Sequence, residues 1–212
     1  MIEEQNEDKQ VKGRIMNLPN ILTFSRIIMI PVFILFFYLN FTGHYLVALA
    51  VFGIASFTDF LDGKIARKYN LVTNLGKFLD PIADKALVLS ALVVFLTVPY
   101  IFTQSLGEWA LITAGCGVAV IIIRELAVSG IRMVAAESKF VIAADIFGKI
   151  KTFTQDICIV VLLLGEGVRE LTDNIAGTVI NYIGLGFFAV SIVLTVISGI
   201  NYLVKNIAVL KQ

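Results

Sequence analysis

Four aspartates stand in one short stretch of an otherwise hydrophobic chain, and their side chains are the ones best suited to chemistry. They are Asp59, Asp62, Asp80 and Asp84. An ionised carboxylate is costly in hydrocarbon, so a cluster of four indicates that divalent cations neutralise them. Oxygen-rich sites of this kind suit hard cations such as Mg²⁺ or Mn²⁺. The sequence therefore predicts a buried metal site.

The spacing of the aspartates is typical of helices. Asp59 and Asp62 are three residues apart, and Asp80 and Asp84 are four apart, so each pair projects from one face of its own helix. A short turn at residues 69–74 would make the two helices antiparallel neighbours with converging acidic faces. Two divalent ions that share carboxylates at roughly 3.5–4 Å form the arrangement used to clamp phosphoryl oxygens. The spacing thus favours phosphoryl chemistry.

The residues between the aspartates fit a phosphate ligand. Gly63 and Gly76 have no side chain and Ala66 has a small one, so a bulky ligand could approach the backbone beside the carboxylates. Arg67 could pair bidentately with a phosphate that the metals also bind. The alternative for the glycines is close helix packing, because small residues are common where membrane helices meet.

Composition places these residues in a membrane protein. The 212 residues are 58% hydrophobic, against roughly 45–50% apolar residues in soluble domains. The net charge of +1 gives no indication of nucleic-acid binding, and a single histidine, His44, argues against histidine-based metal or Ser-His chemistry. Cys116 and Cys158 lie in apolar runs and are interpreted as small buried hydrophobic residues.

Six apolar stretches are long enough to cross a hydrocarbon core, which needs around 20 helical residues. They are residues 21–39, 45–68, 75–98, 109–133, 146–165 and 175–203. We therefore expect an all-α polytopic membrane protein with six transmembrane helices. Residues 1–10 are polar and acidic and are expected to form a disordered cytoplasmic tail, residues 11–20 a short interfacial helix, and residues 21–212 one catalytic domain.

The distribution of lysine and arginine predicts the orientation. Basic residues precede the first span, surround the second–third and fourth–fifth connections and follow the last span, whereas the other connections contain only Arg169. By the positive-inside rule, both termini and the two basic connections are cytoplasmic. The aspartates then lie on the cytoplasmic side of the membrane.

Four basic residues near the fourth–fifth connection could form a second, cationic pocket. Arg124 directly follows an apolar run, where an unpaired guanidinium is costly and an internal partner is expected. Glu125 is one candidate for that partner. Arg132 lies eight residues later on nearly the same helical face, and Lys149 and Lys151 border the next helix, so a site for a dianionic phosphate could be assembled.

The aspartate segment resembles the signature of the CDP-alcohol phosphotransferase family, D-x2-D-G-x2-A-R-x8-G-x3-D-x3-D, at all eight defined positions. The resemblance implies that Asp59, Asp62 and Asp80 are metal ligands, and that Asp84 combines metal proximity with the role of general base. It also implies contacts between the CDP portion of the donor and five motif residues. These are Asp62, Gly63, Ala66, Arg67 and Gly76.

Two further stretches are similar to the bacterial phosphatidylglycerophosphate synthase subfamily. They are residues 17–26, and residues 124–132 with 148–155. The resemblance implies that Asn20, Thr23 and Arg26 frame the nucleotide pocket, and that Arg124, Arg132, Lys149 and Lys151 hold the acceptor's phosphate. The implied substrates are CDP-diacylglycerol and glycerol 3-phosphate, the implied location is the cell membrane, and a homodimer is possible in this family.

Other functions remain open from the sequence. Within the family, the acceptor could be inositol phosphate, another alcohol, or phosphatidylglycerol as in a cardiolipin synthase. A divalent-cation transporter is a candidate from another class, but it predicts acidic residues spread along a path through the bilayer. Here the carboxylates cluster on one side, and the last two apolar segments contain almost none.

Overall fold

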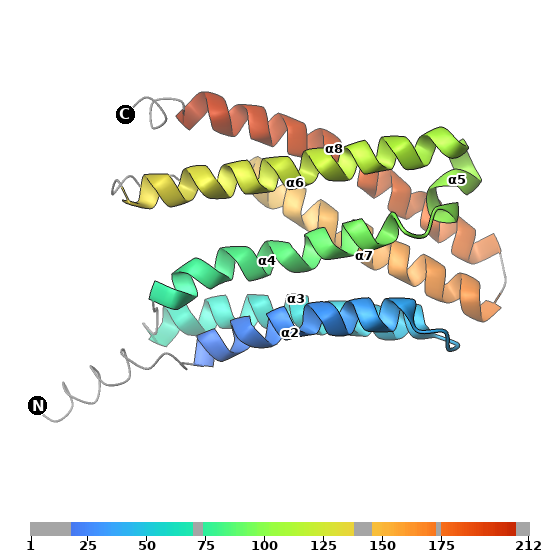
Figure 1. The fold of residues 1–212 in the computed structure, drawn as a ribbon, viewed down its shortest axis with the longest axis horizontal. Helices are drawn as coiled ribbons and strands as arrows, with labels where there is room; N and C mark the ends of the chain where they lie inside the picture. The colour runs from blue at the N-terminus through green and yellow to red at the C-terminus, as the bar shows by residue number, and fades with distance from the viewer. Residues whose placement is uncertain (1–17, 70–73, 138–145, 173–174, 207–212) are drawn as a thin grey trace, which may run out of the picture. The chain divides into compact units, whose positions relative to one another are not determined.

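The computed structural model describes residues 18–69, 74–137, 146–172 and 175–206, and all regular elements in these ranges are α-helices. Figure 1 shows them in chain order. They are α2 (Leu18–Tyr38), α3 (His44–Tyr69), α4 (Asn74–Phe95), α5 (Tyr100–Leu106), α6 (Glu108–Glu137), α7 (Ile146–Thr172) and α8 (Ile175–Asn206). The predicted all-α class is confirmed for this part of the chain.

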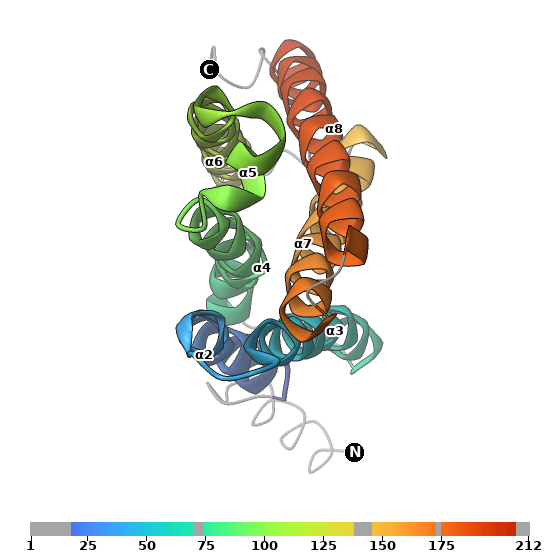
Figure 2. The same ribbon diagram turned by 90° about the vertical axis from the view of Figure 1, so that its right-hand side faces the viewer.

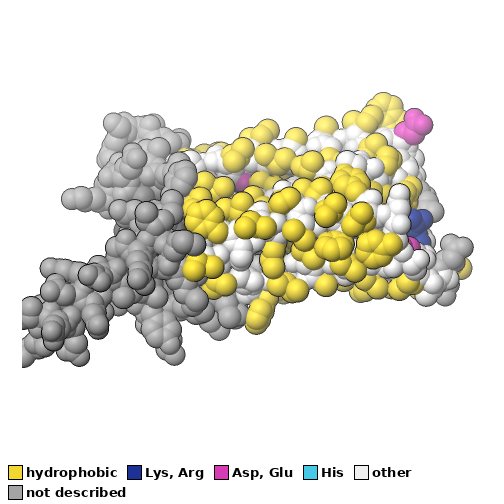
Figure 3. Space-filling view, turned by 60° about the horizontal axis from the view of Figure 1, so that its bottom comes forward, with side chains coloured by type: hydrophobic (Ala, Val, Ile, Leu, Met, Phe, Trp, Pro, Cys, Tyr) yellow, Lys and Arg dark blue, Asp and Glu magenta, His cyan; other side chains and the backbone are white. Residues whose placement is uncertain are grey.

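Each of the six predicted apolar segments falls largely within one of the long helices. Three of the helices contain stretches long and apolar enough to cross a membrane, namely Asn20–Tyr38, Glu108–Arg132 and Ile175–Lys205. Shorter apolar stretches occupy His44–Thr58 and Lys85–Phe95. On the face shown in Figure 3, hydrophobic side chains cover much of the described surface. A surface of this kind is stable in lipid, so the chain is a membrane protein.

The chain divides into two compact units, residues 1–90 and 91–212, which are described separately. In the first unit, α2 and α3 form an antiparallel pair. Gly43, in the connection between them, has a φ of 90°, a conformation that favours glycine. Aromatic side chains fill the contact beyond the turn, where the ring of Phe33 lies 6.0 Å from that of Phe52 and the ring of Phe37 lies 5.2 Å from that of Tyr45.

In the second unit, α7 and α8 pack along each other as an antiparallel pair (Figure 2). Glycines permit the close approach. A Cβ placed on Gly184 of α8 would lie 2.6 Å from Leu162 Cδ2 of α7, and one on Gly165 of α7 would lie 2.1 Å from Asn181 Oδ1 of α8. Helix α6 packs against α8, with Gly117 beside Ile192.

A polar network joins α5, α7 and α8 within the second unit. Glu166 of α7 is fully buried, and its carboxylate accepts hydrogen bonds from Tyr100, from Arg169 at 3.1 Å and from Asn181 at 2.6 Å. The Arg169 guanidinium also lies over the Tyr100 ring, 4.0 Å from its centroid. These contacts satisfy a carboxylate that would otherwise be costly to bury.

Candidate functional site

The aspartate motif lies on two consecutive helices. Asp59 and Asp62 are in α3, and Asp80 and Asp84 are in α4, so the predicted helical setting of each pair is confirmed. The other motif positions follow the same division, with Gly63, Ala66 and Arg67 in α3 and Gly76 in α4. The side chains of these eight residues lie outside the described part of the structure.

The chemistry of this donor set fits divalent cations. Four carboxylates on two helices supply oxygen ligands alone, as Mg²⁺ and Mn²⁺ prefer. Among the side chains that the structure does describe, no group of three or more Asp, Glu, His or Cys residues could hold a metal.

Helix α2 carries the three residues predicted to frame the nucleotide pocket. Asn20, Thr23 and Arg26 recur every three residues on one face, and each is at most 2% exposed. Each has an interaction partner within the chain. Phe33 and Phe37 continue the same buried face toward the other end of the helix. The first turns of α2 are thus lined by polar groups and its later turns by aromatic ones.

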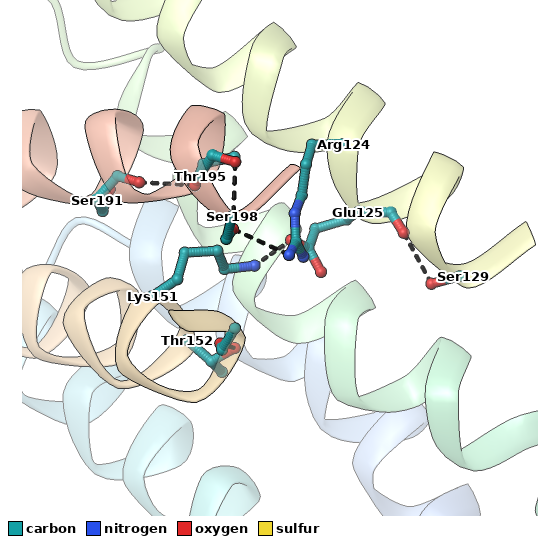
Figure 4. A network of polar contacts seen from close by, with 9 residues as sticks. Arg124, Glu125, Ser129, Lys151, Thr152, Ser191, Thr195 and Ser198 are labelled. Atoms are coloured by element: carbon teal, nitrogen blue, oxygen red, sulfur yellow. Dashed lines mark hydrogen bonds and ion pairs between the residues drawn. The ribbon is translucent and has the colours of Figure 1, made fainter. Parts of the chain in front are cut away.

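The second unit contains a buried cationic cluster, shown in Figure 4 and formed by Arg124, Glu125, Lys151 and Ser198. Arg124 Nη1 donates to Glu125 Oε1 at 2.9 Å, and Lys151 Nζ donates to the same oxygen. Arg124 Nη2 donates to Ser198 Oγ at 3.0 Å. Two of the four predicted acceptor residues therefore meet at one carboxylate, which α6 supplies.

Helix α8 forms one side of this cluster. Ser191, Thr195 and Ser198 are buried hydroxyl residues on one face of α8. Gly199 permits the approach of Arg124, because a Cβ at this position would lie 3.0 Å from Arg124 Cγ. The contribution of Ser198 was not predicted from the sequence. The signal for it was the recurrence of Ser191, Thr195 and Ser198 at helical spacing in a largely apolar segment.

The other two predicted acceptor residues lie in different surroundings. Arg132 is exposed, and its guanidinium carbon lies 5.6 Å from the centroid of the Tyr202 ring. Lys149 is exposed near the beginning of α7. The described structure thus brings together Arg124 and Lys151, while Arg132 and Lys149 remain accessible to solvent or headgroups.

Comparison with known proteins agrees with the signature. Residues 16–202 match the model of the CDP-alcohol phosphatidyltransferase family, so the chain belongs to this family of membrane enzymes. A relative from Bacillus subtilis (strain 168) is 38% identical over 207 residues, which cover 92% of this chain and 97% of the relative. Others from Rickettsia bellii and Shigella flexneri serotype 5b are 38% and 34% identical, each over 88% of this chain and 93% of the relative.

All three relatives are named CDP-diacylglycerol–glycerol-3-phosphate 3-phosphatidyltransferase. The family predicted from the aspartate signature is therefore confirmed, and so is the prediction that the chain is a phosphotransferase. Enzymes of this family generally use divalent metal ions. Membership of the family also decides against the cation transporter.

Proposed function

We propose that this protein transfers the phosphatidyl group of CDP-diacylglycerol to glycerol 3-phosphate, giving phosphatidylglycerophosphate and CMP. The observation that carries the proposal is the complete eight-residue signature on the consecutive helices α3 and α4. Relatives that match the chain over about nine-tenths of its length bear the name of this activity.

The proposed metal centre consists of Asp59, Asp62 and Asp80, with Asp84 beside it. Helix α3 is continuous through its two aspartates, and its buried residues Ala48, Phe52 and Ala55 recur at steps of four and three. Asp59 and Asp62 follow Ala55 at further steps of four and three. The helical period therefore supports a metal centre on the buried face of α3.

The donor's nucleotide is proposed to contact both α2 and the motif helices. Asn20 and Thr23 are buried polar groups that could bond to the nucleotide, and buried Arg26 adds a positive charge suited to its phosphates. Gly63 and Gly76 have no side chain and Ala66 has a small one, so a ligand could approach the backbone there, and Arg67 would supply a second guanidinium.

Asp84 is proposed to act as the general base. Bound Mg²⁺ or Mn²⁺ would polarise the donor's phosphoryl oxygens and stabilise negative charge on the departing CMP. Asp84 accepts the proton of the acceptor's primary hydroxyl, and the resulting oxygen forms a bond to the phosphorus that carries diacylglycerol. The bond from that phosphorus to the oxygen bridging the two phosphates breaks, and CMP leaves.

The acceptor's phosphate is proposed to bind the basic residues of α6 and α7. Lys151 is buried and Arg124 largely buried in this site, and Arg132 and Lys149 are accessible cations near it in the sequence. A dianionic phosphomonoester matches several cations better than the monoanionic phosphodiester of phosphatidylglycerol does. This match favours glycerol 3-phosphate over phosphatidylglycerol as acceptor.

The proposed arrangement in the membrane has six spans, with both termini and the site on the cytoplasmic side. It rests on the six apolar segments and on the distribution of basic residues. Residues 21–212 would form the catalytic domain, after a polar tail at residues 1–10 and an interfacial segment at residues 11–20. A homodimer in the bacterial plasma membrane is part of the same proposal.

The proposed reaction is tested by measuring the release of CMP. The purified full chain is supplied with CDP-diacylglycerol and one alcohol at a time. The alcohols are glycerol 3-phosphate, inositol phosphate and phosphatidylglycerol. We expect the fastest release with glycerol 3-phosphate. Faster release with another alcohol would reassign the acceptor, and no release with any of them would contradict phosphatidyl transfer.

A further inference from the structure

We propose that Glu125 is a positioning residue of the acceptor site, whose carboxylate holds the charged groups of Arg124 and Lys151 together for the incoming phosphate. This inference rests on the proposed function. Glu125 itself would repel the acceptor's phosphate, so its contribution is made through the two cations.

The geometry gives Glu125 this role because a single oxygen receives both cations. Arg124 Nη1 and Lys151 Nζ both donate to Glu125 Oε1, although Arg124 belongs to α6 and Lys151 to α7. Their charged groups therefore lie next to each other at a shared point. A phosphate can accept hydrogen bonds from both cations at once only where their charged groups lie side by side, because the phosphate oxygens are close together.

Burial explains why the two cations need the carboxylate. The side chain of Lys151 is 2% exposed, that of Arg124 is 13% exposed and that of Glu125 is 7% exposed. Two like charges at this depth repel each other, and a buried ammonium stays charged only where an anion compensates for its lost hydration. Glu125 supplies such compensation to both cations through one oxygen.

The arginine of the cluster is also held from α8. Ser198 Oγ accepts a hydrogen bond at 3.0 Å from Nη2 of Arg124, the guanidinium nitrogen that does not contact Glu125 in the bonds described above. The described ion pairs join two positive charges to one carboxylate oxygen. A dianionic phosphate is attracted to two adjacent cations of this kind.

The first test is Glu125→Gln, which preserves the shape of the side chain and removes its charge. We expect the KM for glycerol 3-phosphate to rise at least about tenfold, which is the typical effect of losing one charge-assisted hydrogen bond. The KM for CDP-diacylglycerol should stay within about twofold of the wild-type value. The matched control is Glu166→Gln, which removes the carboxylate of a buried glutamate that also pairs with an arginine, Arg169. It should leave both KM values of the folded fraction near those of wild type.

A double variant separates positioning from general stabilisation. If Glu125 acts through the two cations, Glu125→Gln/Lys151→Met should raise the KM for glycerol 3-phosphate above that of Lys151→Met by clearly less than the roughly tenfold expected of Glu125→Gln in the wild-type background, because only Arg124 remains to be positioned. This comparison stands even if Glu125→Gln alone fails to fold, because the double variant removes both buried charges together.

Three results would overturn the positioning role. They are an unchanged acceptor KM in Glu125→Gln, equal increases in the KM of both substrates, and an additive penalty in the double variant. Failure of the proposed function would show differently, because the wild-type protein itself would then release no CMP with glycerol 3-phosphate.

Discussion

At the scale of single residues, the four aspartates carry distinct proposed roles that substitution can separate. Asp84→Asn should remove the general base while donor binding is largely retained, so kcat should fall by roughly 10²–10⁴. Asp59→Asn should weaken metal and donor binding together, because it removes a metal ligand. Steady-state kinetics with measured metal occupancy checks both variants. Near-normal turnover of Asp84→Asn with full metal occupancy would remove the base assignment.

The basic residues of the acceptor site and Arg67 of the motif are predicted to bind different substrates. Arg124→Ala should raise the KM for glycerol 3-phosphate by roughly ten- to a hundredfold, and Arg67→Ala should instead raise the KM for CDP-diacylglycerol. Arg132→Ala should raise the acceptor KM less than Arg124→Ala does, because Arg132 is exposed and Arg124 is largely buried. Varying each substrate in turn measures these effects. Equal effects of Arg124→Ala on both substrates would exclude Arg124 from the acceptor site.

At the scale of helices, the close packing of α7 against α8 depends on which glycine of α8 faces α7. A Cβ on Gly184 would lie 2.8 Å from Leu162 Cγ, whereas one on Gly186 would have no atom within 4 Å. Replacement by alanine should therefore destabilise the protein at Gly184 but not at Gly186.

Gly184→Ala should destabilise the protein by about 1–3 kcal/mol through overpacking, which lowers the midpoint of thermal unfolding. Gly186→Ala is the matched control, and it should be neutral or stabilising by up to about 1 kcal/mol, since alanine favours helix more than glycine does. Thermal unfolding of both variants in the same detergent makes the comparison. Equal midpoints would show that α7 and α8 do not pack as closely as described.

At the scale of the whole molecule, metal binding should link activity to stability. A chelator should abolish CMP release, and added Mg²⁺ or Mn²⁺ should restore it, because the four carboxylates need a counter-charge. Metal at about 100 times its Kd should also stabilise the folded protein by about 2.7 kcal/mol, which raises the unfolding midpoint. Full turnover in excess chelator would contradict the metal mechanism.

The proposed orientation predicts which residues a membrane-impermeant thiol reagent can reach. In a background without Cys116 and Cys158, Trp109→Cys should be labelled in intact cells, because Trp109 is 78% exposed at the beginning of α6, on the predicted outer side. Lys205→Cys, near the end of α8, should be labelled only after the membrane is permeabilised. Labelling of Lys205→Cys in intact cells would reverse the orientation.

The sequence by itself determined the helical segments and the placement of the aspartate motif. Each depends on local spacing: apolar runs of about 20 residues indicate helices in lipid, and carboxylates three or four residues apart share a helical face. Asp59 and Asp62 in α3, and Asp80 and Asp84 in α4, were predictable for this reason. The family followed from the same motif, because eight residue types at defined spacing identify it.

Only the tertiary structure decided which basic residues meet. Arg124, Arg132, Lys149 and Lys151 are equivalent by charge and by nearness in sequence, yet only Arg124 and Lys151 share Glu125 Oε1. That pairing depends on how α6, α7 and α8 are rotated against one another, which no single helix specifies. Gly184 and Gly186 differ for the same reason, since contact with α7 depends on the packed face of α8 and not on residue type.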